Sequence, residues 1–235
     1  SASRDRMRGR GRGAPCGSRK RTPRECVDPN RLDGARRGVV YRRRVALHPD
    51  PTQPVNVLSI CSGAGGLDLG LRDALARSGI GASRVVCYVE REAFAAACLV
   101  ARMEEGRLDP APVWSDLHGF DPEPWRGLVD CVSGGYPCQP FSQAGRRLGE
   151  RDPRHLWPRI REILAVLRPR LVAFENVSGH VSLGLDVVCG DLQALGYRVA
   201  ATLRQASDVG ASHRRERLFL GGVLADVDVD GREGV

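Results

Sequence analysis

Short apolar runs alternate with amphipathic stretches between residues 55 and 224. Runs of a few Val, Ile, Leu and Ala residues, bounded by glycine, proline or charged residues, are typical of buried strands. This pattern predicts seven strands, at residues 55–60, 85–89, 112–114, 128–132, 171–174, 197–203 and 218–224.

Apolar residues at helical spacing separate these runs. Leu67, Leu71 and Leu75 predict a helix over 67–77, and similar spacing predicts helices over 93–103, 156–167 and 186–195. Alternating strands and helices favour an α/β fold with a doubly wound, mostly parallel sheet. The last two strands could form an antiparallel hairpin at the end of the sheet.

A glycine-rich turn joins the first strand to the first helix, with the sequence Cys61-Ser62-Gly63-Ala64-Gly65-Gly66. Glycine allows a ligand to approach the backbone, and the helix amino terminus offers free N–H donors. The second strand ends at Glu90, where a carboxylate can accept hydrogen bonds from ribose hydroxyls. Any tight turn favours glycine, and Glu90 could be a solvated helix start. The combination indicates an adenosine-containing cofactor.

Two further observations refine this interpretation. Gly65 is followed by no third glycine at dinucleotide spacing, which weakens a nicotinamide or flavin assignment. Asp116 follows the third strand, where it could accept a hydrogen bond from an adenine amino group or cap a helix.

A cysteine lies in the loop after the fourth strand, within Gly135-Tyr136-Pro137-Cys138-Gln139-Pro140. Ligands bind at the carboxyl ends of strands in open α/β sheets, so Cys138 is a candidate nucleophile. A lone cysteine is more often a buried structural thiol. Three groups at neighbouring strand ends favour chemistry instead: Glu175, Arg215 and Arg217. A thiol, a carboxyl and guanidinium groups suit covalent attack on an electron-poor ring rather than metal binding.

Charge divides the chain into two parts. Residues 1–54 hold 15 of the 36 Lys and Arg and 5 of the 28 Asp and Glu, a net charge of +10, and residues 55–235 carry −2. The arm is rich in Arg, Gly and Pro, so we interpret it as largely disordered, with one short strand conceivable at 38–47. A basic arm suggests a nucleic-acid partner, although a solvated tail without a specific role is an equal alternative. Residues 55–235 would form one catalytic domain.

The eight cysteines do not indicate a disulfide framework or a zinc site, because no Cys-x-x-Cys occurs. Cys61, Cys87 and Cys131 lie in or beside apolar runs and are expected to act as small core residues. No secretory signal or membrane-spanning run is found, so a reducing cytoplasm is expected, with Cys138 a free thiol.

Taken in order, these motifs resemble the DNA (cytosine-5-)-methyltransferase family over about residues 55–224. The resemblance implies a Rossmann-like fold that binds S-adenosylmethionine and transfers its methyl group to carbon 5 of cytosine. Cys138 would be the nucleophile, Glu175 would bind ring nitrogen 3, and Arg215 and Arg217 would support Glu175 and the cytosine carbonyl. The residues matching the family's cofactor site are Cys61, Ser62, Gly63, Gly65, Gly66, Leu67, Glu90, Asp116, Leu117 and Pro137.

The resemblance further implies double-stranded DNA as partner, extrusion of the target base, and a bacterial or phage protein in the bacterial cytoplasm. The sequence departs from the family in two respects. Cys61 replaces the phenylalanine that stacks on the adenine, and no target-recognition domain or final motif is found in the 16 residues after Phe219.

Four interpretations follow from the missing half. The chain could be a minimal methyltransferase whose basic arm contacts phosphates, or a catalytic subunit that needs a separate target-recognition chain. It could instead be a non-catalytic remnant that binds cofactor or DNA, or a methyltransferase of tRNA cytosine, since an RNA-directed branch shares these motifs.

Overall fold

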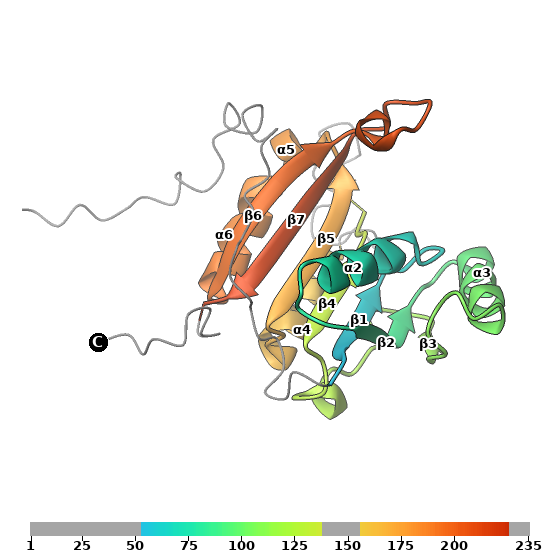
Figure 1. Cartoon of the computed structure of the whole chain (residues 1–235). Coiled ribbons are helices and arrows are strands. Elements are labelled where there is room, and N and C mark those ends of the chain that lie inside the picture. Colours follow the sequence, from blue (N-terminus) through green and yellow to red (C-terminus); the bar gives the residue numbers. More distant parts are fainter. Residues whose placement is uncertain (1–52, 138–155, 226–235) are drawn as a thin grey trace, which may run out of the picture.

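The computed structural model describes residues 53–137 and 156–225 (Figure 1). The predicted basic arm up to residue 52, the conceivable strand at 38–47 and the candidate nucleophile Cys138 lie outside the described residues. So do residues 226–235.

The described residues form a seven-stranded sheet in the order β3-β2-β1-β4-β5-β7-β6. Strands β1 to β5 run parallel, and β7 is antiparallel to both β5 and β6, so the predicted mostly parallel sheet and terminal hairpin are confirmed. The strands are β1 (Val55–Ile60), β2 (Ser83–Val89), β3 (Val113–Trp114), β4 (Cys131–Gly134), β5 (Leu171–Val177), β6 (Tyr197–Arg204) and β7 (Arg217–Leu224).

Helices cover both faces of the sheet (Figure 1). Leu75 of α2 and Leu99 of α3 pack in one apolar cluster with Val57 and Val85. A larger cluster on the opposite face joins Ile160 of α4 and residues of α6 to the sheet. Neighbouring strand residues point to opposite faces, and the two clusters therefore sandwich the sheet. The helices are α2 (Gly66–Arg77), α3 (Ala93–Glu104), α4 (Trp157–Leu167), α5 (His180–Leu183) and α6 (Leu185–Ala194).

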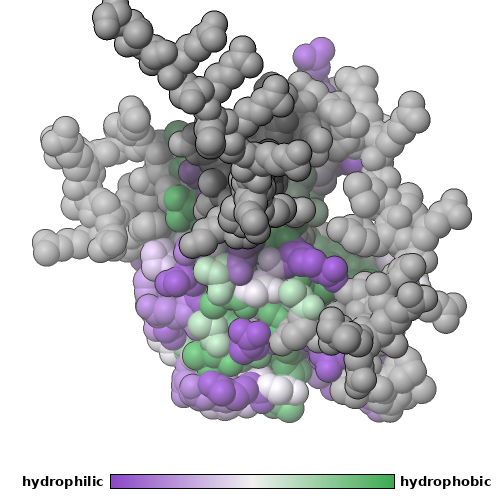
Figure 2. Space-filling view, turned by 90° about the vertical axis from the view of Figure 1, so that its left-hand side faces the viewer, coloured by the Kyte–Doolittle hydropathy of each residue, from purple (hydrophilic) through white to green (hydrophobic). Residues whose placement is uncertain are grey.

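Strand β6 forms one edge of the sheet, beside α6 (Figure 1). The side of the molecule turned to the viewer in Figure 2 mixes hydrophobic and hydrophilic residues below the grey atoms. Val187 on α6 is one of the apolar residues that remain exposed.

The fourth strand lies further along the chain than predicted. It spans Cys131–Gly134, whereas the apolar run predicts 128–132. Leu128 is 56% exposed, while Ser133 and Gly134 are fully enclosed between β1 and β5. A small polar residue and a glycine resemble a loop in sequence, but only small residues fit at this crowded position. A Cβ on Gly134 would lie 2.6 Å from the Ile60 carbonyl oxygen.

The fifth strand is longer than the apolar run predicts. β5 extends to Val177 because each residue from Leu171 to Val177 pairs with β7. Glu175 and Asn176 are therefore strand residues, which the antiparallel partner holds in register, and not part of a following loop. The short helix α5 was not predicted.

Candidate active site

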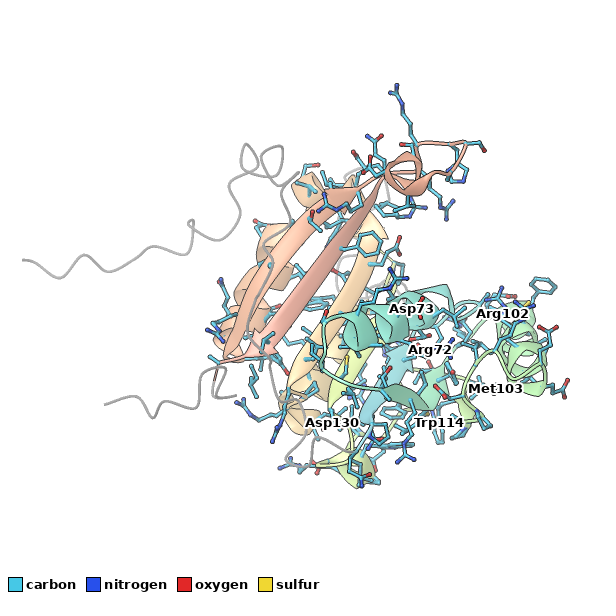
Figure 3. The ribbon with its side chains drawn as sticks, viewed as in Figure 1. Arg72, Asp73, Arg102, Met103, Trp114 and Asp130 are labelled. Carbon is cyan, nitrogen blue, oxygen red and sulfur yellow. The ribbon has the colours of Figure 1, made fainter. Side chains whose placement is uncertain are left out.

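The glycine turn follows β1 at the carboxyl edge of the sheet. Gly65 adopts a left-handed φ of 76° and caps α2, and a Cβ at this position would lie 2.6 Å from Leu108 Cδ1. Glycine is thus required here by both backbone conformation and packing. Arg102 of α3 (Figure 3) donates a hydrogen bond to the carbonyl of Ala64 and so holds the outer side of the turn.

Glu90 is fixed against this turn. Its Oε2 accepts from the Gly63 amide at 2.7 Å, and its Oε1 accepts from the Glu92 amide at 2.7 Å. Each carboxylate oxygen has a second lone pair, so the half-buried carboxylate can accept further donors such as ribose hydroxyls. The predicted proximity of the turn and this acid is observed.

The other predicted cofactor residues surround the same edge. Asp116 is exposed and accepts at Oδ1 from the His118 amide at 3.2 Å, while Leu117 is buried. Burial, and secondarily the charge of Glu90, raise the pKa of Cys61 to about 12, so this half-buried thiol stays neutral. A glycine turn with two separate acids fits the donor groups of an adenosine moiety. Ser62 is buried, and Leu67 and Pro137 are half-buried.

Glu175 and Arg217 form an ion pair across β5 and β7. Arg217 Nε lies 2.7 Å from Glu175 Oε1, and the two side chains are 23% and 29% exposed. Arg217 pairs with Val177 in the ladder, two residues beyond Glu175 and on the same face, which allows this diagonal contact. Arg215 is exposed with a φ of 28°. The structure therefore brings one of the two predicted arginines onto the carboxylate.

The backbone that leads to Cys138 passes beside this ion pair. A Cβ on Gly135 would lie 3.3 Å from Glu175 Oε2, which places the carboxylate next to the chain three residues before the cysteine. Asn176 is buried and its Nδ2 donates to the Tyr136 carbonyl at 2.9 Å. Glu175 thus lies beside the backbone that leads to Cys138, and its neighbour Asn176 holds that backbone by a hydrogen bond.

A buried aromatic pair supports the same segment. Tyr136 Oη and His180 Nε2 are 3.0 Å apart, and burial lowers the pKa of His180, which favours a neutral imidazole. Neither residue was predicted to contribute. His180 carries no sequence signal of its own, because only the fold brings α5 against Tyr136, two residues after β4.

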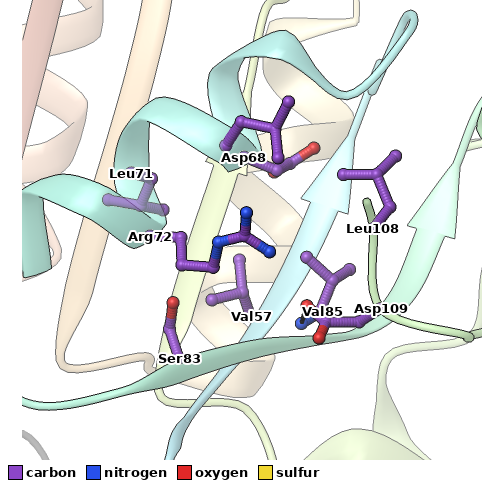
Figure 4. Close-up of a pocket in the computed structure, with 9 residues that line it drawn as sticks. Val57, Asp68, Leu71, Arg72, Ser83, Val85, Leu108 and Asp109 are labelled. Atoms are coloured by element: carbon purple, nitrogen blue, oxygen red, sulfur yellow. Dashed lines mark hydrogen bonds between the residues drawn. The ribbon is translucent and has the colours of Figure 1, made fainter. Parts of the chain in front are cut away.

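A small cavity lies beneath α2 (Figure 4) and is separate from this edge. Its volume is about 10 Å³, which is room for about one water molecule, and it is lined in part by Asp68, Arg72 and Asp109. Among the described residues, no cluster of three His, Cys, Asp or Glu side chains could hold a metal ion. A search of the same residues finds no helix that could span a membrane.

The domain is Rossmann-like and of the methyltransferase class. Three features define it: the antiparallel strand β7, the glycine turn after β1 and Glu90 after β2. Residues 55–233 match the family model of C-5 cytosine-specific DNA methylases, and the chain belongs to this family.

Relatives and solved structures agree with this assignment. The chain is 30% identical over 184 residues to the type II methyltransferase M.PspPI of Psychrobacter sp., covering 76% of this chain and 42% of the relative. It is 34% identical over 166 residues to M.NgoMIV of Neisseria gonorrhoeae, covering 69% and 49%. The chain thus spans slightly less than half of these relatives.

The fold matches two solved structures. A putative prophage-encoded DNA modification methyltransferase of E. coli has a TM-score of 0.53 at 27% identity, covering 72% of this chain and 47% of that one. DNMT2 of Spodoptera frugiperda, a mutant, has a TM-score of 0.59 at 21% identity, covering 77% and 54%, and supports the fold alone.

Proposed function

We propose that this chain transfers a methyl group from S-adenosylmethionine to carbon 5 of cytosine in DNA. The observation that carries the proposal is the Glu175 carboxylate, which Arg217 holds at 2.7 Å beside the backbone leading to Cys138. Membership of the family supports the same activity.

The methyl donor would bind at the glycine turn. The backbone from Gly63 to Gly66 would approach it closely, Glu90 would accept from the ribose hydroxyls, and Asp116 with Leu117 would hold the adenine. When bound, S-adenosylmethionine supplies an electrophilic methyl group on its sulfonium. Cys61 leaves the adenine without a stacked phenyl ring. Trp114, 47% exposed at the end of β3 (Figure 3), is an aromatic side chain that could take that place.

Cytosine chemistry would use this chain's own groups. The Cys138 thiolate would add to carbon 6 of the ring, and the electrons of the 5,6 double bond would become available at carbon 5. Glu175 would donate a proton to ring nitrogen 3 and so neutralise the negative charge that builds there, with Arg217 keeping the carboxyl in place. Carbon 5 would gain the methyl group as the donor's sulfonium leaves as a neutral thioether. The carbon 5 proton would pass to solvent water and the nitrogen 3 proton back to Glu175, so that the double bond re-forms as the Cys138 thiolate leaves.

The cytosine must leave the helix stack to reach these groups, at a cost of a few kcal/mol. The basic arm at 1–54 would contribute phosphate contacts. A separate chain that supplies target recognition is the second candidate partner. The bacterial cytoplasm is part of the proposal, since the relatives named above are bacterial.

The test is label transfer from methyl-labelled S-adenosylmethionine to duplex DNA. We expect transfer by the wild type, none by Cys138→Ser, and unchanged transfer by the control Cys98→Ser on α3. Equal transfer by Cys138→Ser would refute the covalent mechanism. No transfer, with retained cofactor binding, would favour a binding subunit or remnant. Transfer to tRNA alone would favour the RNA-directed alternative.

A second measurement tests the arm. Deletion of residues 1–54 should weaken DNA binding and flatten its dependence on salt, because fewer phosphate contacts release fewer counterions. Cofactor affinity should be unchanged. An unaltered salt slope would show that the arm makes no phosphate contacts.

A further inference from the structure

Asp68 is buried at the start of α2, away from the ion pair described above. It is 6% exposed, and its two carboxyl oxygens contact serines from two strands. Oδ1 lies 2.7 Å from the Ser133 hydroxyl of β4, and Oδ2 lies 2.9 Å from the Ser59 hydroxyl of β1. One carboxyl group therefore connects a helix to two central strands.

The chain of contacts continues into the glycine turn. The Ser59 hydroxyl lies 2.9 Å from the Ser62 hydroxyl, and the Ser62 hydroxyl lies 3.0 Å from the Ser59 carbonyl oxygen. All three serines are buried, so no bulk water competes for these positions. Ser62 belongs to the turn at which the methyl donor is proposed to bind, and Ser133 lies five residues before Cys138.

Counting protons fixes the state of this group. Four oxygen–oxygen contacts of 2.7–3.0 Å each need one proton, and three serine hydroxyls supply three. The Val89 carbonyl lies 3.4 Å from the Ser62 hydroxyl, a longer contact that can share the Ser62 proton with the Ser59 carbonyl. Ser133 can donate to Oδ1, and Ser62 to the Ser59 carbonyl. The single proton of Ser59 cannot serve both Ser62 and Asp68. The fourth proton must come from the Asp68 carboxyl, which would donate from Oδ2 to Ser59.

If Asp68 were ionised, only three protons would be available for the four contacts. Ser59 would then donate to Asp68, and the Ser62 proton would have to serve either the Ser59 hydroxyl or the Ser59 carbonyl. One pair of oxygens would face each other at 2.9–3.0 Å without a proton, which is repulsive in a buried site. The neutral acid satisfies all four contacts.

The surroundings agree with this assignment. Burial raises the pKa of Asp68 from 3.8, against the opposing effect of the two serine hydrogen bonds. The titratable and charged groups that face it are Arg72, Tyr88, Asp109 and Cys131, of which Arg72 and Asp109 line the cavity of Figure 4. Arg72 is exposed and donates to the Arg107 carbonyl, and within the described ranges none of these groups forms an ion pair with Asp68.

The geometry points to Asp68 as a neutral carboxylic acid that positions the active site, by joining the glycine turn through Ser59 and Ser62 to strand β4 through Ser133. Displacement of the turn would be passed to the strand that carries the Cys138 loop, so donor binding and the nucleophile loop share one rigid support. The link to turnover rests on the proposed function. The protonation state of Asp68 and its connection between the glycine turn and β4, here called the clamp, do not rest on it.

The protonation state is tested by denaturant unfolding of full-length wild type, Asp68→Asn and the control Asp73→Asn between pH 4 and pH 8. An asparagine amide reproduces the neutral acid, because its N–H donates to Ser59 and its oxygen accepts from Ser133. A carboxyl whose pKa is raised on folding loses stability as pH rises from the unfolded pKa to the folded pKa. Each unit of that rise changes the unfolding constant tenfold, about 1.4 kcal/mol.

We therefore expect the unfolding constant of wild type relative to Asp68→Asn to increase at least about tenfold from pH 4 to pH 8. Asp73 is exposed on the same helix, and its variant should track the wild type at every pH. A ratio that is flat, or that falls as pH rises, would show that Asp68 is ionised in the fold and would overturn the assignment.

The clamp is tested with Ser133→Ala, which removes only the link to β4. We expect lower methyl transfer at saturating cofactor while the affinity for S-adenosylmethionine, measured by calorimetry, is retained. Unchanged transfer would overturn the positioning role. If wild type transfers no methyl group, the proposed function fails, but the unfolding series still decides the state of Asp68.

Discussion

Gly134 is the position at which the packing of the central sheet can be tested most directly. It is buried on β4 opposite Ile60 of β1, and an added Cβ would lie 2.6 Å from both the Ile60 carbonyl oxygen and its Cγ1. Ordinary contact begins at 3.4 Å, so Gly134→Ala must separate two central strands by roughly 0.8 Å. Both close atoms belong to Ile60, one in its backbone and one near the base of its buried side chain, so no flexible group can move away.

The expected cost follows from this overlap. Overpacking a buried site costs about 1–3 kcal/mol, and a reduced unfolded-state entropy returns about 0.4–1 kcal/mol. Gly134→Ala should therefore lower the free energy of unfolding by about 1 kcal/mol, or the melting temperature by about 2–4 °C. Urea unfolding followed by circular dichroism measures the first quantity.

Gly70→Ala is the matched control for this substitution. Gly70 lies inside α2, and an added Cβ meets nothing within 4 Å. This variant should gain up to about 1 kcal/mol, because alanine favours a helix interior over glycine. If Gly134→Ala were as stable as wild type, the close approach of β1 and β4 would be wrong.

Three further predictions concern the site. Glu90→Gln should weaken S-adenosylmethionine binding by about tenfold in calorimetry, because it replaces a charged carboxylate acceptor beside Gly63 with a neutral amide. Unchanged affinity would show that Glu90 is not part of the cofactor site. Asn176→Ala should cost about 0.5–1.5 kcal/mol of stability in urea unfolding, because it removes the hydrogen bond to the Tyr136 carbonyl, and a loss near zero would contradict that hydrogen bond. Burial raises the pKa of Cys87 to about 11 and that of Cys61 to about 12, and it raises the pKa of Cys131 further still. Brief iodoacetamide labelling of native protein at pH 8, read by mass spectrometry, should therefore spare these three thiols.

Much of the fold could be predicted because its signals are local. The first strand was predicted with its observed bounds, and the helices were placed to within a residue or two, because apolar periodicity reports which side of an element is buried. The short helix α5 was not predicted, and the largest errors in strand bounds fall at β4 and β5. There, Ser133, Gly134 and Glu175 have the composition of a loop, and pairing with neighbouring strands overrides that preference.

By itself, the sequence determined which chemical groups are available and in what order: a glycine turn, acids after two strands, a thiol between prolines, and Glu175 followed by two arginines. Motif order is a property of the chain, so it needs no coordinates.

Only the tertiary structure decided which groups meet. The antiparallel register of β5 and β7 selects Arg217, rather than Arg215, as the partner of Glu175. The parallel register of β4 and β5 brings Asn176 to the Tyr136 carbonyl. The Asp68 network is of the same kind. Its residues are ordinary in sequence, and they become a single unit because parallel pairing of β1 and β4 under α2 encloses them where every proton must be shared.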